Sequence, residues 1–343
     1  MPYLPPFYER VTPSYGRRHV LLTATALAMA RVARGAVPDS ATVLVAGPSR
    51  CATAVWADLI LPALAQALPP GTRLGSESVG GLDGVTAANQ FQARAAPDGS
   101  AALLLPGAAA LAWLVGDPRA RFNAAQWVTA LAGTTPALIA SRLPLARLAA
   151  GQVVRVGGDP AGPALAALLA LELAGALPQA VPSSMSLGDV DALVLHGRET
   201  ARQIEAASQA GFKPVLTLHE RGSGALPARD PDYAEVPSSR DWLAASQHQP
   251  LSAALDAAIV AIRLDTALVL PPLTSAGMVA IWRRACAQAA ETPTTQVAAS
   301  RLGISAQVEA AAVASTSPLA AVGTATLLEL RRWLAQRLGW HPS

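Results

Sequence analysis

The stretch that decides the fold is Ala93-Arg94-Ala95-Ala96-Pro97-Asp98-Gly99-Ser100-Ala101-Ala102-Leu103-Leu104-Leu105. Pro97-Asp98-Gly99 is a turn signal, because each of these residue types favours the backbone angles of a tight turn. The apolar run that follows it, from Ala101 to Leu105, is short and predicts a buried strand. A helix is predicted just before the turn, from about Thr86 to Ala95. Helix, turn and buried strand in this order are typical of a parallel α/β sheet.

The same alternation continues on both sides of this stretch. Ala41-Thr42-Val43-Leu44-Val45 contains β-branched residues and ends at Ala46-Gly47-Pro48, as a buried strand that enters a loop does. Further strands are predicted at residues 127–132, 137–141, 153–157, 192–195, 214–218 and 267–270. Further helices are predicted at residues 53–68, 163–174, 200–210, 275–290 and 319–338. The pattern therefore predicts an α/β protein.

Composition narrows the class of protein. The chain has 343 residues, enough for two compact domains, and 52% of them are hydrophobic. Only 14% are charged, which argues against intrinsic disorder. The net charge of +3 is too small, and the arginines are too scattered, for a nucleic-acid-binding surface.

The beginning of the sequence is typical of an export signal. Arg17 and Arg18 precede an apolar stretch from Val20 to Ala30, and the paired arginines resemble a twin-arginine signal. That stretch is too short to cross a bilayer, which takes about 20 residues. The sequence thus predicts a signal over residues 1–36 and a periplasmic protein. An ordinary amphipathic first helix is the alternative.

Few side chains point to catalysis or metal binding. Cys51 and Cys286 exclude a disulfide-dense scaffold and a zinc site of the CxxC type, and they leave a single disulfide open. The histidines show no metal-ligand spacing, and the chain lacks the GxSxG nucleophile motif and the phosphate-binding glycine motifs. We therefore expect no cofactor, no metal and no enzymatic activity, with a secreted hydrolase as the alternative.

The order of the motifs resembles a known family. Residues 93–105 are similar to the "A-K-A-A-P-D-G" turn and strand of the Bug receptors, also called the TctC-type solute receptors of tripartite tricarboxylate transporters. Similar stretches of that family are matched at residues 157–162, 188–191, 235–237 and 268–277. The resemblance covers nearly the whole chain after residue 40.

This resemblance implies an α/β, two-lobed periplasmic-binding-protein fold of type II (Venus-flytrap), with mixed, mostly parallel sheets flanked by helices. The first lobe would comprise residues 41–141 and 266–343, and the second residues 142–265. It also implies a monomeric receptor whose interlobe cleft holds a small carboxylate and whose partner is a membrane permease. A receptor that reports to a sensor kinase, or that binds no ligand, is the alternative.

Two loops depart from the family pattern. Where the first loop usually reads "P-A-G-G-x-x-D", this chain has Pro48-Ser49-Arg50-Cys51-Ala52-Thr53-Ala54, and "P-Y-K-G" is replaced by Pro182-Ser183-Ser184-Met185. Arg50 could clamp a carboxylate or be a solvated loop residue, and Asp83 could contact ligand or cap its helix. The candidate ligand-binding residues are Ser49, Arg50, Thr53, Gly81, Asp83, Thr86, Gly107, Asp159, Ala161, Ser183, Ser184 and His196.

Overall fold

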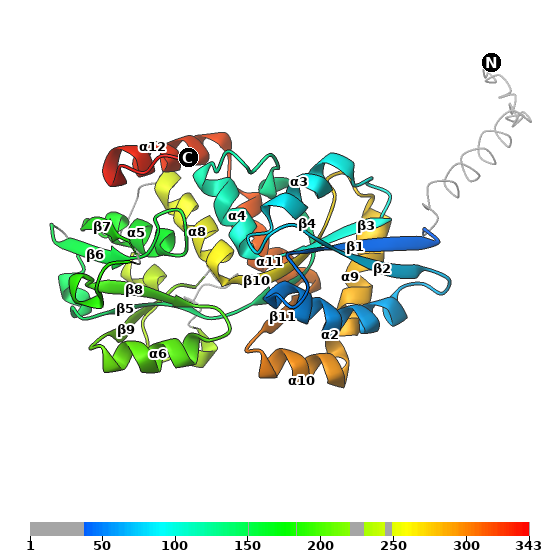
Figure 1. Ribbon diagram of the computed structural model, residues 1–343, viewed down its shortest axis with the longest axis horizontal. Coiled ribbons are helices and arrows are strands. Elements are labelled where there is room, and N and C mark those ends of the chain that lie inside the picture. The colour runs from blue at the N-terminus through cyan, green and yellow to red at the C-terminus, as the bar shows by residue number, and fades with distance from the viewer. Residues whose placement is uncertain (1–37, 150, 183, 220–229, 244–248, 343) are drawn as a thin grey trace, which may run out of the picture. The chain divides into compact units, whose positions relative to one another are not determined.

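A computed structural model describes residues 38–149, 151–182, 184–219, 230–243 and 249–342. Residues 1–36, the predicted export signal, lie outside the described residues. Residues Val37–Ser343 form one compact unit. Within it, two separate sheets are flanked by helices (Figure 1).

The first sheet combines strands from both ends of this unit. Its order is β11-β4-β10-β3-β1-β2, with β1 parallel to β2 and β3, and β10 antiparallel to β3 and β4. Its strands are β1 (Ser40–Ala46), β2 (Arg73–Val79), β3 (Ala101–Leu105), β4 (Val128–Thr134), β10 (Leu264–Leu270) and β11 (Ser305–Val308). The turn at Pro97-Asp98-Gly99 delivers β3 to the centre of this sheet, as the sequence predicts.

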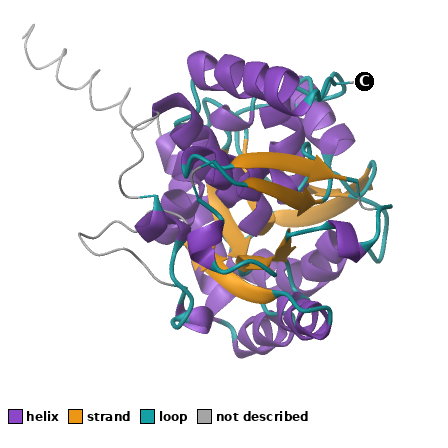
Figure 2. Cartoon of the chain, turned by 90° about the vertical axis from the view of Figure 1, so that its left-hand side faces the viewer, coloured by secondary structure: helices purple, strands orange, loops and turns teal. Residues whose placement is uncertain are grey.

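The second sheet is built from the middle of the chain. Its order is β7-β6-β8-β5-β9, with β6 parallel to β7 and β8, and β5 antiparallel to β8 and β9. Its strands are β5 (Ala137–Ser141), β6 (Val153–Gly157), β7 (Leu177–Val181), β8 (Ala192–His196) and β9 (Lys213–Thr217). Viewed from the side of this sheet, helices lie on both sides of the strands (Figure 2). The strands of the second sheet thus all come from residues 137–217.

The chain crosses between the sheets at two places. The first crossover is Thr135-Pro136, between β4 and β5, and the second joins the helix that ends at Arg263 to β10. The predicted lobe boundaries are therefore corrected: residues 137–141 belong to the second sheet, and the first sheet resumes at Leu264 rather than at residue 266. Strand 137–141 is as apolar as the strands of either sheet, so its own sequence does not say which sheet it joins.

Helices cover both sheets. Around the first sheet lie α2 (Ala52–Ala67), α3 (Val85–Arg94), α4 (Gly107–Val115), α9 (Ala276–Glu291), α10 (Pro293–Arg301) and α11 (Glu309–Ala320). The second sheet carries α5 (Ala164–Leu173), α6 (Thr200–Gln209) and α7 (Ser239–Trp242). Two more, α8 (Gln249–Arg263) and α12 (Thr324–Leu338), pack against each other, and α8 also packs against α4 and α5, so these two join the lobes (Figure 1).

Apolar cores stabilise this arrangement, and the two largest among the described residues lie as follows. One lies between the first sheet and the helices α2 and α9, where Val43, Trp56 and Trp282 are buried. The other extends from α4 through α8 to α5 and includes Leu165 and Ile259. Because the second core spans both lobes, it places the start of α4 opposite the start of α5.

In the described part of the chain no single helix is long and apolar enough to cross a membrane. The bent pair formed by α11 and α12 reaches the length and the apolar composition of a membrane span only when the two helices are taken together.

The two cysteines are free thiols in different environments. Cys51 is the N-cap of α2 and its Sγ accepts the N–H of Ala54 at 3.4 Å, whereas Cys286 is buried in α9. Burial raises the pKa of the Cys286 thiol to about 12. Because only the thiolate reacts readily, we expect iodoacetamide at pH 8 to modify Cys51 in the native protein and Cys286 only after unfolding in urea. Mass spectrometry of the alkylated peptides measures this, and rapid native labelling of Cys286 would contradict the burial described here.

Candidate ligand-binding site

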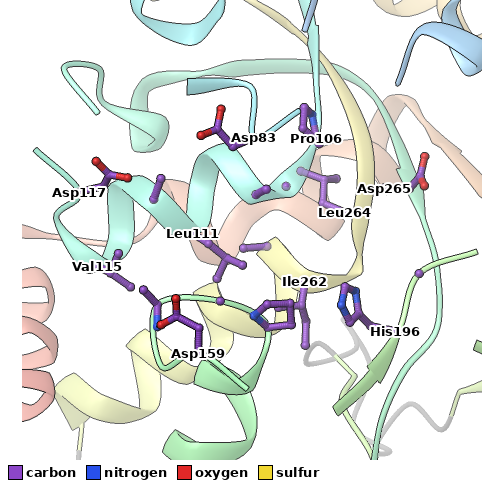
Figure 3. Close-up of a pocket in the computed structure, with 18 of the residues that line it drawn as sticks. Asp83, Pro106, Leu111, Val115, Asp117, Asp159, His196, Ile262, Leu264 and Asp265 are labelled. Atoms are coloured by element: carbon purple, nitrogen blue, oxygen red, sulfur yellow. The ribbon is translucent and has the colours of Figure 1, made fainter. Parts of the chain in front are cut away.

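A cavity of about 660 Å3 lies between the two lobes. Its size is within the range of small-molecule sites, about 300–1,000 Å3. The first lobe contributes α4 and the loops around Asp83 and Asp117, and the second lobe contributes the loops around Asp159 and His196 (Figure 3). Thr135 and Leu264, at the two crossovers between the sheets, also line it. The cavity is therefore an interlobe cleft.

The N-terminus of α4 opens into this cleft. Pro106, Gly107 and Ala108 line the cavity at the point where β3 passes into α4. The first amide groups of a helix have no partner within the helix, and the N-cap Pro106 supplies no side-chain hydrogen bond to them. Together with the partial positive charge of the helix start, these N–H groups form a site that suits a carboxylate.

Gly107 is required for this geometry. A Cβ at this position would overlap the carbonyl oxygen of Ala261 and lie 2.7 Å from that of Leu264. The start of α4 therefore packs directly on the backbone where α8 passes into β10. This contact holds the amide donors of α4 against the second crossover.

The loop before α5 faces α4 from the second lobe. Asp159, Ala161, Gly162 and Pro163 line the cavity, and Pro163 is the N-cap of α5 without a side-chain hydrogen bond. The carboxylate of Asp159 accepts the N–H of Ala161 at 2.8 Å. Figure 3 shows Asp159 across the cavity from Asp83 and Asp117. Two helix starts thus meet at one cleft, and the second already carries a carboxylate.

Arg119 neutralises the acidic groups of the first lobe. Its guanidinium lies 2.7 Å from Oδ2 of Asp117 and 3.0 Å from Oδ2 of Asp83. Hydrogen bonding to Arg119 holds the pKa of Asp117 below its usual range. The carboxylate of Asp83 also accepts the N–H of Val85 at 3.1 Å, so it caps the start of α3 while it lines the cleft. Both carboxylates are therefore paired with the same guanidinium.

Arg198 joins the second lobe to the first. It follows β8, and its guanidinium donates to both carboxylate oxygens of Asp265 at 2.7 and 2.8 Å. It also donates to the carbonyl oxygen of Ala52, in the first turn of α2, at 2.9 Å. The side chains of Arg198 and Asp265 are 14% and 8% exposed. This buried ion pair therefore holds one side of the cleft closed.

His196 is the imidazole that lines the cleft among the described residues. Burial lowers the pKa of His196, so its imidazole is neutral at pH 7. Its backbone N–H and C=O pair with the side-chain amide of Gln203, at 2.9 and 3.1 Å. A neutral imidazole donates one hydrogen bond and accepts another, which suits a polar group of a ligand rather than its charge.

The structure brings five of the sequence-predicted residues together around the cavity: Asp83, Gly107, Asp159, Ala161 and His196. Six others that it describes do not line the cavity, namely Ser49, Arg50, Thr53, Gly81, Thr86 and Ser184. Ser183 lies outside the described residues. Arg50 is exposed with a positive φ of 75°, and Thr53 is buried in α2, so neither side chain reaches the cleft.

Several residues of the cleft are not among those predicted from the sequence. Asp117, Arg119 and Trp340 line it, and Arg198 closes it through Asp265. The signal for Asp117 and Arg119 was Gly116, a left-handed glycine that ends α4 and brings the following loop back toward the helix. Asp265 and Arg198 are 67 residues apart, and no local pattern connects them.

Comparison with known proteins identifies the fold. No family model matches the chain, and no curated protein matches its sequence. The structure is similar to a TctC solute-binding protein from Polaromonas, with a TM-score of 0.62 and 15% identity over 87% of this chain and 98% of that chain. This chain shares the TctC solute-binding protein fold. The resemblance predicted from residues 93–105 and the two-lobed fold class are thereby confirmed at the level of the fold.

Two other solved structures are similar to most of this chain. MatC from Rhodopseudomonas palustris, with bound malate, is 19% identical over 85% of this chain and 98% of that chain, with a TM-score of 0.48. The periplasmic binding protein BugD is 16% identical over 87% of this chain and 97% of that chain, with a TM-score of 0.47.

Proposed function

We propose that this protein is a periplasmic, non-enzymatic receptor that captures a small organic carboxylate in the interlobe cleft. The observation that carries the proposal is the start of α4, whose uncapped amide groups open into a cavity of about 660 Å3. Amide donors at a helix start bind a carboxylate without a metal ion or a lysine. The TctC solute-binding fold supports the same assignment.

The side chains of the cleft favour binding over hydrolysis. Among the described residues that line it, the hydroxyl belongs to Thr135, and its Oγ1 donates to the carbonyl oxygen of Arg263 at 3.3 Å. That hydroxyl faces the crossover backbone rather than a general base. The lining imidazole of His196 has no serine or cysteine beside it on the cavity wall that the structure describes. A serine or cysteine nucleophile paired with a base, which hydrolysis through a covalent intermediate would need, is not assembled on the described wall.

The route of export and the partner belong to the proposal as well. Arg17 and Arg18 support delivery to the periplasm by a twin-arginine signal. Closure of the two lobes on a ligand would present one continuous surface to a membrane partner. A permease of the tripartite tricarboxylate type fits the fold best, and a sensor kinase is the second candidate. The receptor would act as a monomer.

A thermal-shift screen of the mature protein against small carboxylates, sulfonates and amino acids tests the binding function. A ligand at about 100 times its dissociation constant should raise the free energy of unfolding by roughly 2.7 kcal/mol. In a chain of this size the melting temperature should rise by about 5 °C. No shift with any compound, for a protein shown to be folded, would contradict the proposed function.

A blocked cleft provides the control for that screen. Ala108 is exposed and lines the cavity in the first turn of α4, so Ala108→Trp should fill the cleft without disturbing the core. We expect this variant to keep its melting temperature and lose the shift. Val55→Trp, at an exposed position of α2 outside the cavity lining, is the matched control and should respond like the wild type.

A further inference from the structure

The charges of the cleft point to the class of carboxylate. Among the described lining residues there are four aspartates, Asp83, Asp117, Asp159 and Asp265, and one arginine, Arg119. Arg119 is committed to Asp117 and Asp83, and Arg198 reaches Asp265 from outside the lining. No described arginine of the cleft is left to pair with a second carboxylate of a ligand.

Asp159 is the carboxylate that these arginines leave uncompensated. Its Oδ1 accepts the N–H of Ala161, and no hydrogen bond or ion pair to its Oδ2 is found among the described residues. Figure 3 shows it apart from Pro106, which marks the start of α4, where the ligand carboxylate would bind. A dicarboxylate that spans the cleft would therefore place its second negative charge against Asp159.

An aromatic residue lines the same cavity as this carboxylate. Trp340 lines the interlobe cavity with Asp159, and the two residues also line a smaller hollow with Gly158 and Pro160. A carboxylate combined with an indole face is the combination that recognises an ammonium group, through an ion pair and a cation–π contact.

A helix-terminating hydrogen bond and an ion pair position Trp340 beside the cavity. Gly339 ends α12 with a left-handed φ of 62°, and the N–H of Trp340 bonds to the carbonyl oxygen of Leu334 at 3.1 Å. Arg337 in the last turn of α12 pairs with Glu172 of α5 at 3.3 Å. The C-terminal helix is thus fastened to the same helix whose preceding loop carries Asp159.

We propose that the ligand is an amino carboxylate, whose carboxylate binds the start of α4 and whose ammonium group lies between Asp159 and Trp340. This inference rests on the proposed function, because it assigns the second end of the same ligand. A receptor with this site would bind an amino carboxylate more tightly than a dicarboxylate of the same length. The start of α4 and the loop at Asp159 belong to different lobes, which favours an ammonium group that is remote from the carboxylate.

Matched pairs of compounds test the inference by titration calorimetry. The probes are 4-aminobutanoate against succinate, and 6-aminohexanoate against adipate, with 4-hydroxybutanoate as the neutral member and 1,4-diaminobutane as the member without a carboxylate. We expect the amino carboxylate of at least one pair to bind more tightly than its dicarboxylate by about tenfold or more. Tighter binding of the dicarboxylates or of 4-hydroxybutanoate would overturn this inference and leave the proposed function standing.

Two variants assign the effect to the residues. Asp159→Asn keeps the side-chain oxygen that caps Ala161, so the fold should persist, while affinity for the amino carboxylate should fall by about tenfold or more. Trp340→Leu should weaken the amino carboxylate more than the dicarboxylate. Asp58→Asn, at an exposed position of α2 outside the lining, should change neither. Unchanged selectivity in Asp159→Asn would overturn the assignment.

The remaining outcomes concern the proposed function itself. Tight binding of 1,4-diaminobutane, with no binding of any carboxylate, would overturn the carboxylate part of the proposed function. Binding of none of the probes or of the compounds in the wider screen would overturn the receptor assignment. Failure of the inference and failure of the function are therefore distinguished by which compounds bind.

Discussion

Arg198→Ala is expected to lower the free energy of unfolding by about 3 kcal/mol. The substitution removes two hydrogen bonds to Asp265 and one to the carbonyl oxygen of Ala52. Asp265 would then remain as a carboxylate that is only 8% exposed and has lost its cation. An uncompensated buried charge is costly because it has lost both its hydration and its partner.

Urea unfolding followed by circular dichroism measures this effect as a lower midpoint with an unchanged slope. Arg202→Ala is the matched control. Arg202 lies four residues after Arg198 and pairs with Glu199, but the side chains of Arg202 and Glu199 are 83% and 61% exposed. Exposed pairs contribute about 0–1 kcal/mol, so the control should unfold close to the wild type. If both variants unfolded alike, the ion pair would not hold the lobes together.

Gly107→Ala is expected to be destabilised by about 3 kcal/mol, at the upper end of the overpacking range. The added methyl group would meet the carbonyl oxygens of Ala261 and Leu264, which are backbone atoms and cannot rotate away. Relief requires the start of α4 to move from the crossover. Because that movement displaces the amide donors of α4, ligand affinity should fall together with stability.

The same urea titration measures the stability of this variant, and calorimetry with the tightest compound of the screen measures its affinity. Gly277→Ala is the control, since no atom lies within 4 Å of its added Cβ and the residue sits in α9. Alanine favours a helix over glycine by about 1 kcal/mol, so the control should be as stable as the wild type or more stable. Wild-type stability in Gly107→Ala would contradict the close packing of α4 on the crossover.

The strands that the sequence predicts are those with a continuous apolar run. β3 and β1 are mostly buried, so their composition is nearly sufficient to identify them. β2, with the sequence Arg-Leu-Gly-Ser-Glu-Ser-Val, is exposed over most of its length at the edge of the first sheet. Its pairing with β1, rather than its own composition, makes it a strand, so its residues alone do not predict it.

Some predicted helix boundaries differ from the observed ones for a related reason. Residues 319–338 were predicted as one helix, but α11 ends at Ala320 and α12 begins at Thr324, after Gly323. α4 and α8 were not predicted at all. α4 has the apolar sequence Gly-Ala-Ala-Ala-Leu-Ala-Trp-Leu-Val without a polar face, because most of its residues are buried against neighbouring elements. The periodicity of apolar residues identifies helices that face water on one side, whereas α4 is buried on most of its surface.

For the cleft, local sequence predicts backbone features better than side-chain partners. Gly107 and the loop at Asp159 follow strands and precede helices, which is enough to place them at the ends of strands. Arg50 looked suitable because it follows the first strand, yet its side chain does not line the cavity. The pairs Arg119–Asp83 and Arg198–Asp265 join residues from different elements, so only the folded chain brings them together.

The measurement that tests the central claim most directly is a crystal structure of the protein with the tightest compound of the screen. We expect that compound in the interlobe cavity, with its carboxylate oxygens about 2.7–3.2 Å from the backbone nitrogens of Gly107 and Ala108. A carboxylate bound to Arg50, or a compound bound outside this cavity, would contradict the account.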